Sequence, residues 1–130
     1  MATSTITDHN KLVTGTVDWA TGAKTESDTR FATTLHRHGK LVVFQCAAEL
    51  TNTYFSTTYT TICTLPAGFR PANELMGAAA VGTSVWGANS KAKFYLTADG
   101  TVSIYATANT SAGESASCNH VQFCVTYIAG

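Results

Sequence analysis

Both prolines of the chain lie in one short segment, residues 65–71 (LPAGFRP). Proline lacks a backbone N–H and pushes the preceding residue into an extended conformation, so neither a helix nor a central strand can pass through Pro66 or Pro71. The residues just before this break, 59–65, are rich in the β-branched and aromatic side chains that are typical of a strand. The segment therefore predicts a corner that carries the chain between two sheets, with Phe69 as the apolar plug beneath it.

A hairpin is predicted farther along the chain, over residues 93–105. Asp99 and Gly100 allow the positive φ values that a tight turn needs. The alternation of side chains places four apolar residues on one core face: Phe94, Leu96, Val102 and Ile104. Tyr95 and Tyr105 are then expected on the opposite face.

Further strands are predicted at residues 41–46, 54–65 and 120–128, and no stretch of a dozen residues repeats its apolar positions at helical spacing. In residues 41–46 both alternating faces are apolar enough to predict that this strand is covered on both sides. Several short strands without a helix indicate an all-β fold, an antiparallel β-sandwich or barrel.

Residues 1–34 are polar and threonine-rich, with few apolar anchors. Such a segment is too poor in apolar residues to bury itself, so we expect it either to stay mobile or to lie extended along a neighbouring subunit, with Trp19 as its docking point. The alternative is a first edge strand followed by a loop through residues 21–23. The remaining residues, 35–130, are long enough for one domain with its own core.

Charge and hydropathy exclude several classes of protein. Only 12% of the 130 residues are charged, the formal net charge is zero, and no basic run is available to neutralise phosphates, which argues against nucleic-acid binding. No apolar run approaches the about 20 residues of a membrane span, and the first residues lack the features of a signal peptide. This composition is typical of an extracellular or virion β-protein.

The four cysteines, Cys46, Cys63, Cys118 and Cys124, have neither CxxC nor zinc-finger spacing. Cys46, Cys63 and Cys124 lie in apolar, strand-like runs, which favours buried free thiols that pack as small apolar side chains. Disulfides are the alternative.

Three segments together resemble the C-terminal head domains of bacteriophage tail fibres and receptor-binding proteins: residues 37–43 (RHGKLVV), 64–71 (TLPAGFRP) and 94–102 (FYLTADGTV). The resemblance covers about residues 35–130. It implies a small jelly-roll-like head that assembles as a homotrimer at the tip of a fibre or baseplate in the virion. It also implies that the head binds a host cell-surface polysaccharide. Residues 1–34 lie outside the resemblance; we expect them to form an extended or neck-like segment, and we expect other tail proteins to contact the N-terminal side.

Catalysis is not expected. A glycosidase needs two carboxylates that converge on one bond, and the eight acidic residues are scattered along the chain. No nucleophile elbow indicates a serine hydrolase, and no cofactor is expected. We therefore expect a binding protein. The first alternative is a virion trimerisation module without a ligand, and the second is a small carbohydrate-active enzyme.

His36 and His38 are the residues that the sequence offers for a metal ion. Residues two apart in a strand share one side, so three copies around a threefold axis would present six imidazoles, enough for an octahedral ion. Histidine pairs of this form also resemble the iron-binding motifs of some trimeric phage fibres. The simpler interpretation, which we adopt, is a surface strand next to Gly39 with no metal and with Arg37 on the other side, able to pair with an acid.

Sugar binding needs aromatic faces for the C–H side of a pyranose and planar polar groups for its hydroxyls. Trp86 is the best candidate, because it lies in a short, polar, glycine-containing segment where the core does not obviously need it. The other candidates are Asn89, Tyr54, Tyr59, Asn109 and Asn119. The alternative role for Trp86 and the tyrosines is in the core or at a subunit interface.

Overall fold

The computed structural model of the chain describes residues 11–82, 91–107 and 118–130. These residues form antiparallel strands and no helix, so the prediction of an all-β antiparallel fold is confirmed. Among them there is accordingly no helix that could cross a membrane. The strands are β1 (Leu12–Thr14), β2 (Asp18–Trp19), β3 (Ala23–Thr25), β4 (Thr34–His38), β5 (Leu41–Leu50), β6 (Thr60–Thr64), β7 (Leu75–Gly82), β8 (Lys91–Leu96), β9 (Thr101–Thr107) and β10 (His120–Ile128).

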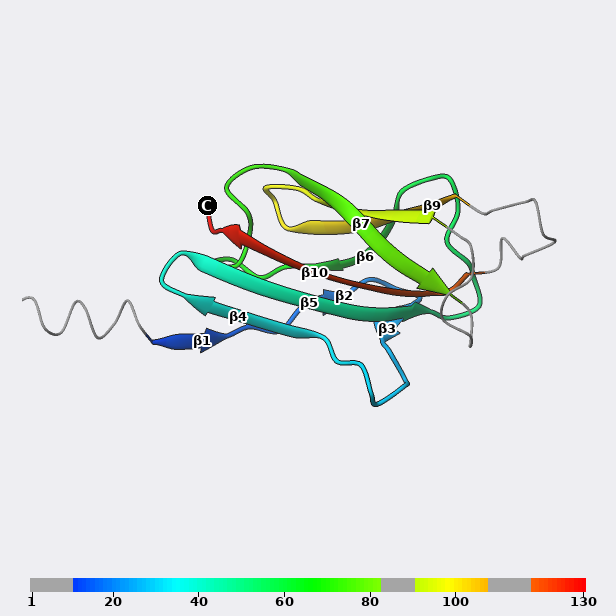
Figure 1. Cartoon of the computed structure of the whole chain (residues 1–130), viewed down its shortest axis with the longest axis horizontal. Coiled ribbons are helices and arrows are strands. Elements are labelled where there is room, and N and C mark those ends of the chain that lie inside the picture. Colours follow the sequence, from blue (N-terminus) through cyan, green and yellow to red (C-terminus); the bar gives the residue numbers. More distant parts are fainter. Residues whose placement is uncertain (1–10, 83–90, 108–117) are drawn as a thin grey trace, which may run out of the picture.

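The strands form one curled sheet in the order β1-β4-β5-β10-β7-β8-β9-β6-β2. β10 pairs with β5 along its whole length but with β7 only through residues 120–122. At this short pairing the sheet folds back on itself. Two layers result, β4, β5 and β10 in one and β6, β7, β8 and β9 in the other (Figure 1). The apolar faces of the two layers enclose the core between them.

The N-terminal segment joins the edges of these two layers. β3 pairs with the second half of β5, whereas β2 pairs with β6 in the other layer. A tight turn connects the two strands, since the backbone N–H of Ala23 donates to the carbonyl of Ala20 at 3.0 Å. Trp19 packs against the core of its own chain. Strands within residues 12–25 thus belong to the sheet, which agrees with the alternative of an N-terminal edge strand. The proposed boundary between an N-terminal segment and a head domain at residue 34 stays a prediction.

Phenylalanine rings fill the centre of the core. Phe123 of β10 meets Phe44 of β5 edge to face at 5.5 Å and stacks on Phe94 of β8 at 4.5 Å, so one ring ties the two layers together. All three residues are buried, as their positions in alternating runs predicted.

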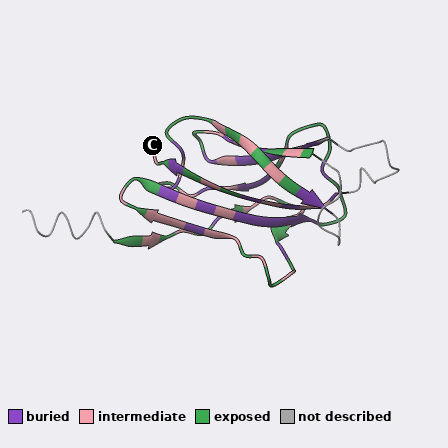
Figure 2. Ribbon diagram, viewed as in Figure 1, coloured by how far each residue is buried: buried purple, intermediate pink, exposed green. Residues whose placement is uncertain are grey.

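The prediction that β5 is covered on both sides is wrong for its first half. Val42, Phe44 and Cys46 are fully buried, but Leu41 on the other face is 44% exposed. From Cys46 to Leu50 every residue is buried, as the continuous purple of this half of β5 shows in Figure 2. In this second half the segment after β3 lies against β5, because the N–H of Glu26 donates to the Ala47 carbonyl at 2.9 Å and the N–H of Ser27 donates to Glu49 Oε1 at 2.8 Å.

The predicted hairpin is β8 and β9, with Phe94 opposite Ile104 and Leu96 opposite Val102. All four side chains are buried, which confirms the predicted core face. In the turn only Gly100 has a positive φ, of 93°. Asp99 instead accepts the backbone N–H of Thr101 at 3.1 Å, so its contribution is a side-chain hydrogen bond and not the positive φ that we predicted.

The corner, residues 65–71, leads from β6 to β7, which both belong to the second layer, so the prediction that it carries the chain between two sheets is wrong. A turn begins at Pro66, whose carbonyl accepts the N–H of Phe69 at 3.1 Å, and Gly68 supplies the positive φ of 90° that a type II turn requires at its third position. Phe69 is 6% exposed, so its predicted role as the apolar plug is confirmed. The hydroxyl of Tyr127 donates to the Phe69 carbonyl at 2.6 Å and fixes the corner to the end of β10.

The four cysteines are free thiols in the structure. Cys46 and Cys63 are buried as predicted, but Cys124 is exposed and Cys118 is buried instead. The reason is the two-residue period of β10: Phe123 points into the core, so its neighbour Cys124 points out. A hydrogen bond with the neighbouring Cys63 thiol, followed by burial, raises the pKa of Cys46, so this thiol stays protonated.

Candidate functional site

A group of tyrosines lies on the outer face of the hairpin. Because Phe94 and Leu96 of β8 point inward, Lys93 and Tyr95 point outward, and Lys93 stands directly opposite Tyr105 of β9. The prediction that Tyr95 and Tyr105 face away from the core is consistent with their partial exposure.

Tyr59, just before β6, completes this group. Its ring centroid lies 5.4 Å from that of Tyr95 and 5.4 Å from that of Tyr105. We call Tyr59, Tyr95 and Tyr105 the tyrosine cluster. The ammonium group of Lys93 lies over two of its rings, 4.9 Å from the centroid of Tyr105 and 5.7 Å from that of Tyr59. Cation–π attraction therefore holds a positive charge on the aromatic surface.

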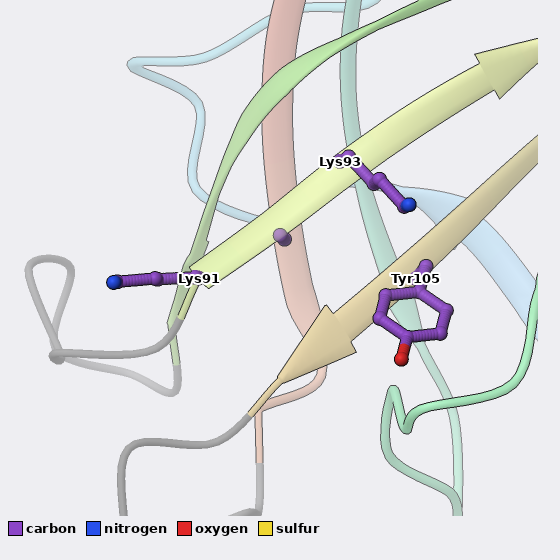
Figure 3. Close-up of a pocket in the computed structure, with 4 residues that line it drawn as sticks. Lys91, Lys93 and Tyr105 are labelled. Carbon is purple, nitrogen blue, oxygen red and sulfur yellow. The ribbon is translucent and has the colours of Figure 1, made fainter.

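A hollow of about 190 Å³ lies beside the cluster and is lined by Lys91, Ala92, Lys93 and Tyr105. Figure 3 shows the Lys93 side chain extending toward the ring of Tyr105, while Lys91 points away from both. Two segments join the hairpin at the Lys91 end: residues 83–90 precede β8 and residues 108–117 follow β9. The hollow thus offers the aromatic ring of Tyr105 beside the Lys93 ammonium group.

Tyr95 is held by an acid at the edge of the cluster. Its hydroxyl donates to Glu74 Oε2 at 2.7 Å. This hydrogen bond, followed by desolvation, raises the pKa of Tyr95 above its ordinary value. The hydroxyl is therefore protonated over the physiological range and donates its proton to Glu74.

The saccharide-binding residues predicted from sequence fall in different places. Tyr59 belongs to the tyrosine cluster and is 44% exposed, whereas Tyr54 is 56% exposed in the segment before it. The side-chain amide of Asn119 donates to the Leu50 carbonyl at 3.2 Å, which fixes the start of β10 to the end of β5. Three further candidates lie outside the described residues: Trp86, Asn89 and Asn109.

His36 and His38 share the outer side of β4, as predicted for residues two apart. His36 Nδ1 lies 3.5 Å from Thr14 Oγ1, and His38 stands between Leu12 of β1 and Leu41 of β5 in the register of the sheet. Arg37 points the other way but pairs with no acid within the described part of the chain. Its guanidinium donates to the Gly68 carbonyl at 2.6 Å and lies 5.3 Å from the centre of the Phe69 ring, because the corner is what β4 faces on that side.

The acids are not all scattered in space, which corrects the expectation from sequence. Glu26 and Glu49 both approach His120: Glu26 Oε2 lies 2.6 Å from His120 Nδ1, and Glu49 Oε2 lies 4.0 Å from His120 Nε2. The pairing of β10 with β5 sets His120 opposite Glu49, and such a register cannot be read from residues 71 positions apart. Lys93 was likewise missed, although its place two residues before Tyr95 in an alternating strand was a usable signal.

Comparison with known proteins gives no relative. No protein-family model matches this chain, and no curated protein matches it either.

Proposed function

We propose that this chain is the receptor-binding head of a bacteriophage tail fibre or baseplate tip, carried on the virion, and that it binds a bacterial cell-surface saccharide without catalysis. The observation that supports it best is the tyrosine cluster with Lys93 beside an open hollow. Tyrosine rings present flat apolar faces for the C–H side of a sugar ring, and an ammonium group donates hydrogen bonds to hydroxyls or carboxylates.

Binding without cleavage is supported by the residues around the hollow. The described residues that line it include no acid, whereas glycoside hydrolysis needs a pair of carboxylates on either side of the scissile bond. Glu74 contacts the cluster but is hydrogen-bonded to the Tyr95 hydroxyl. The lysines instead favour saccharides that carry carboxylate or phosphate groups.

The outer face of the other layer supports the proposed homotrimer. Three large apolar side chains follow one row across the sheet and are exposed: Leu12 at 49%, Leu41 at 44% and Ile128 at 54%. His38 completes the row between Leu12 and Leu41. A second copy of the chain that covers this row would bury Leu41 on the face that the sequence pattern predicts to be covered. Three copies would also present three saccharide sites, and multivalency would strengthen weak single sites.

The same row favours a second function, a trimerisation module of the phage tail with no ligand of its own. That function needs the apolar row but not the tyrosine cluster, so separate substitutions distinguish the two. In both proposals the N-terminal side of the chain contacts other tail proteins.

The binding proposal is tested with a panel of purified bacterial surface polysaccharides and by adsorption of the domain to host cells. We expect Tyr59→Ala and Trp86→Ala to abolish adsorption while the melting temperature stays nearly unchanged. Tyr54→Ala, which truncates an exposed tyrosine outside the cluster, is the comparison and should reduce adsorption less than Tyr59→Ala does. Normal adsorption of Tyr59→Ala would contradict the proposed site, and unfolding of Trp86→Ala would show that this tryptophan is structural.

The trimer is tested by sedimentation at micromolar concentration. We expect the chain to sediment as a trimer and Leu41→Asp to sediment as a monomer with unchanged circular dichroism, because a charge in the middle of the row opposes its burial. Thr61→Asp, on the outer face of the other layer, is the control. If the unsubstituted chain sediments as a monomer, the proposed trimer is wrong, and so is the arrangement of six imidazoles from His36 and His38 of three copies.

A further inference from the structure

Two glutamates and a histidine from distant parts of the chain meet at one end of the sheet. Glu26 follows β3, Glu49 lies in β5, and His120 begins β10. The pairings of β3 and β10 with β5 bring the three together on one side of the sheet. Their side chains are only 1%, 11% and 14% exposed, and one donor atom from each lies within 4.8 Å of the others.

Each carboxylate is already oriented by the backbone. Glu49 Oε1 accepts the N–H of Ser27 at 2.8 Å, and Glu26 Oε1 accepts the N–H of Asp28 at 3.2 Å. The second oxygen of each glutamate is then the one directed at the imidazole. Backbone hydrogen bonds to the outer oxygens of ligating carboxylates are typical of metal sites, where they fix the inner oxygens in place.

The charge of this cluster favours a cation. Two buried carboxylates face a single imidazole, which carries at most one positive charge. The ammonium of Lys24 lies 3.8 Å from Glu49 Oε1, but its side chain is 52% exposed, so water screens its contribution. Buried charges are stable in proteins when they are paired or coordinate metals, and a divalent ion would balance both carboxylates.

We propose that Glu26, Glu49 and His120 bind one divalent transition metal ion of the zinc class, with water in the remaining coordination position. An imidazole nitrogen with two carboxylate oxygens suits such ions, whereas Ca²⁺ takes oxygen ligands only and more of them. Two bonds of roughly 2 Å at a tetrahedral angle place their ligand atoms about 3.3 Å apart. The three donor atoms lie within 4.8 Å of one another, so rotation of the side chains would bring them to this spacing, with the ion in place of the contact between Glu26 and His120. The ion would fasten the segment after β3 to β5 and β10, and so would hold the N-terminal segment in the sheet.

The test uses the full chain freed of metal with a chelator and then dialysed against Zn²⁺ alone, with Ca²⁺ as the comparison ion. We expect one Zn²⁺ per chain, a higher melting temperature with Zn²⁺ and no such change with Ca²⁺. Glu49→Gln keeps the shape of the side chain and should weaken Zn²⁺ binding at least about tenfold. The double substitution His36→Asn and His38→Asn is the matched control and should leave the affinity unchanged.

A measurement on the unsubstituted chain keeps the test valid if Glu49→Gln does not fold. Nitrogen-15 resonances of the histidine rings should shift at His120 when one equivalent of Zn²⁺ is added, and those of His36 and His38 should not. Shifts confined to His36 and His38, no binding at millimolar Zn²⁺, or full affinity in a folded Glu49→Gln chain would each overturn the proposal. Adsorption to host cells after chelation tests the tyrosine cluster separately, because that surface contains no ligand of this ion.

Discussion

The corner at residues 65–71 and the tyrosine cluster use their polar groups in opposite ways. At the corner the carbonyls of Gly68 and Phe69 accept hydrogen bonds from Arg37 and Tyr127, and the Phe69 ring is 6% exposed. In the cluster Tyr59 is 44% exposed and contacts other rings and the Lys93 ammonium. One region thus stabilises the fold, while the other leaves apolar and charged surface exposed. Substitutions should therefore reduce stability at the corner and binding at the cluster.

The largest effect is expected for Phe69→Ala. Removal of this buried ring leaves a cavity beneath the corner, between the Arg37 guanidinium and the core, and such truncations cost about 3–5 kcal/mol. Chemical denaturation followed by circular dichroism measures the change in the free energy of unfolding. Tyr54→Ala, which truncates an exposed ring, is the control, and equal effects of the two substitutions would contradict the assignment of Phe69 to the core.

Gly100→Val tests how the hairpin is fixed to the corner. The residue has a φ of 93°, and an added Cβ would lie 2.8 Å from both the Leu65 carbonyl oxygen and Arg70 Nε. Strain and steric overlap together should destabilise the fold by about 3 kcal/mol. Gly22→Val separates the two causes, because Gly22 has a similar φ of 86° but an added Cβ there would meet no atom within 4 Å. It should lose less stability, and thermal unfolding of both variants compares them.

Tyr127→Phe removes the hydrogen bond that ties the corner to β10. The Phe69 carbonyl would lose its partner at a buried site, which costs about 1–3 kcal/mol. Tyr105→Phe, which removes a hydroxyl beside the open hollow, is the control and should change stability little. Denaturant unfolding at neutral pH measures both.

The same tyrosine predicts a dependence of stability on pH. Burial raises the pKa of Tyr127 well above its ordinary value of 10.0. Because the folded-state pKa is the higher one, the associated stability is complete below the ordinary pKa and is lost as the pH rises toward the folded-state value. The melting temperature of the unsubstituted chain should therefore fall above about pH 10, and it should fall less steeply in Tyr127→Phe. If the melting temperatures of the two chains fall equally with rising pH, the Tyr127 hydroxyl is not the cause of the loss of stability.

The parts of this fold that local chemistry determines were predictable from sequence. Proline at residues 66 and 71 marked the corner, the turn at Gly100 marked the hairpin, and alternation identified the buried phenylalanines. The site depends on pairings between distant strands and was predicted only in part. The sequence identified Tyr59 as a candidate, but it did not predict that Tyr59 contacts Tyr95 and Tyr105. Likewise, no local pattern around Glu26, Glu49 or His120 predicts that these side chains meet.

Tyr59→Ala should have the smallest effect on stability and so gives the sharpest contrast with the corner. The side chain is already 44% exposed, and its contacts are two tilted ring pairs and one cation–π contact, so truncation should cost less than about 1 kcal/mol. Saccharide binding should nevertheless be lost, because the remaining rings of Tyr95 and Tyr105 no longer form a continuous wall. Denaturant unfolding and adsorption to host cells, measured on the same preparation, compare the two quantities directly. A loss of stability as large as that of Tyr127→Phe would mean that the cluster stabilises the fold like the corner does, and the distinction between the two regions would fail.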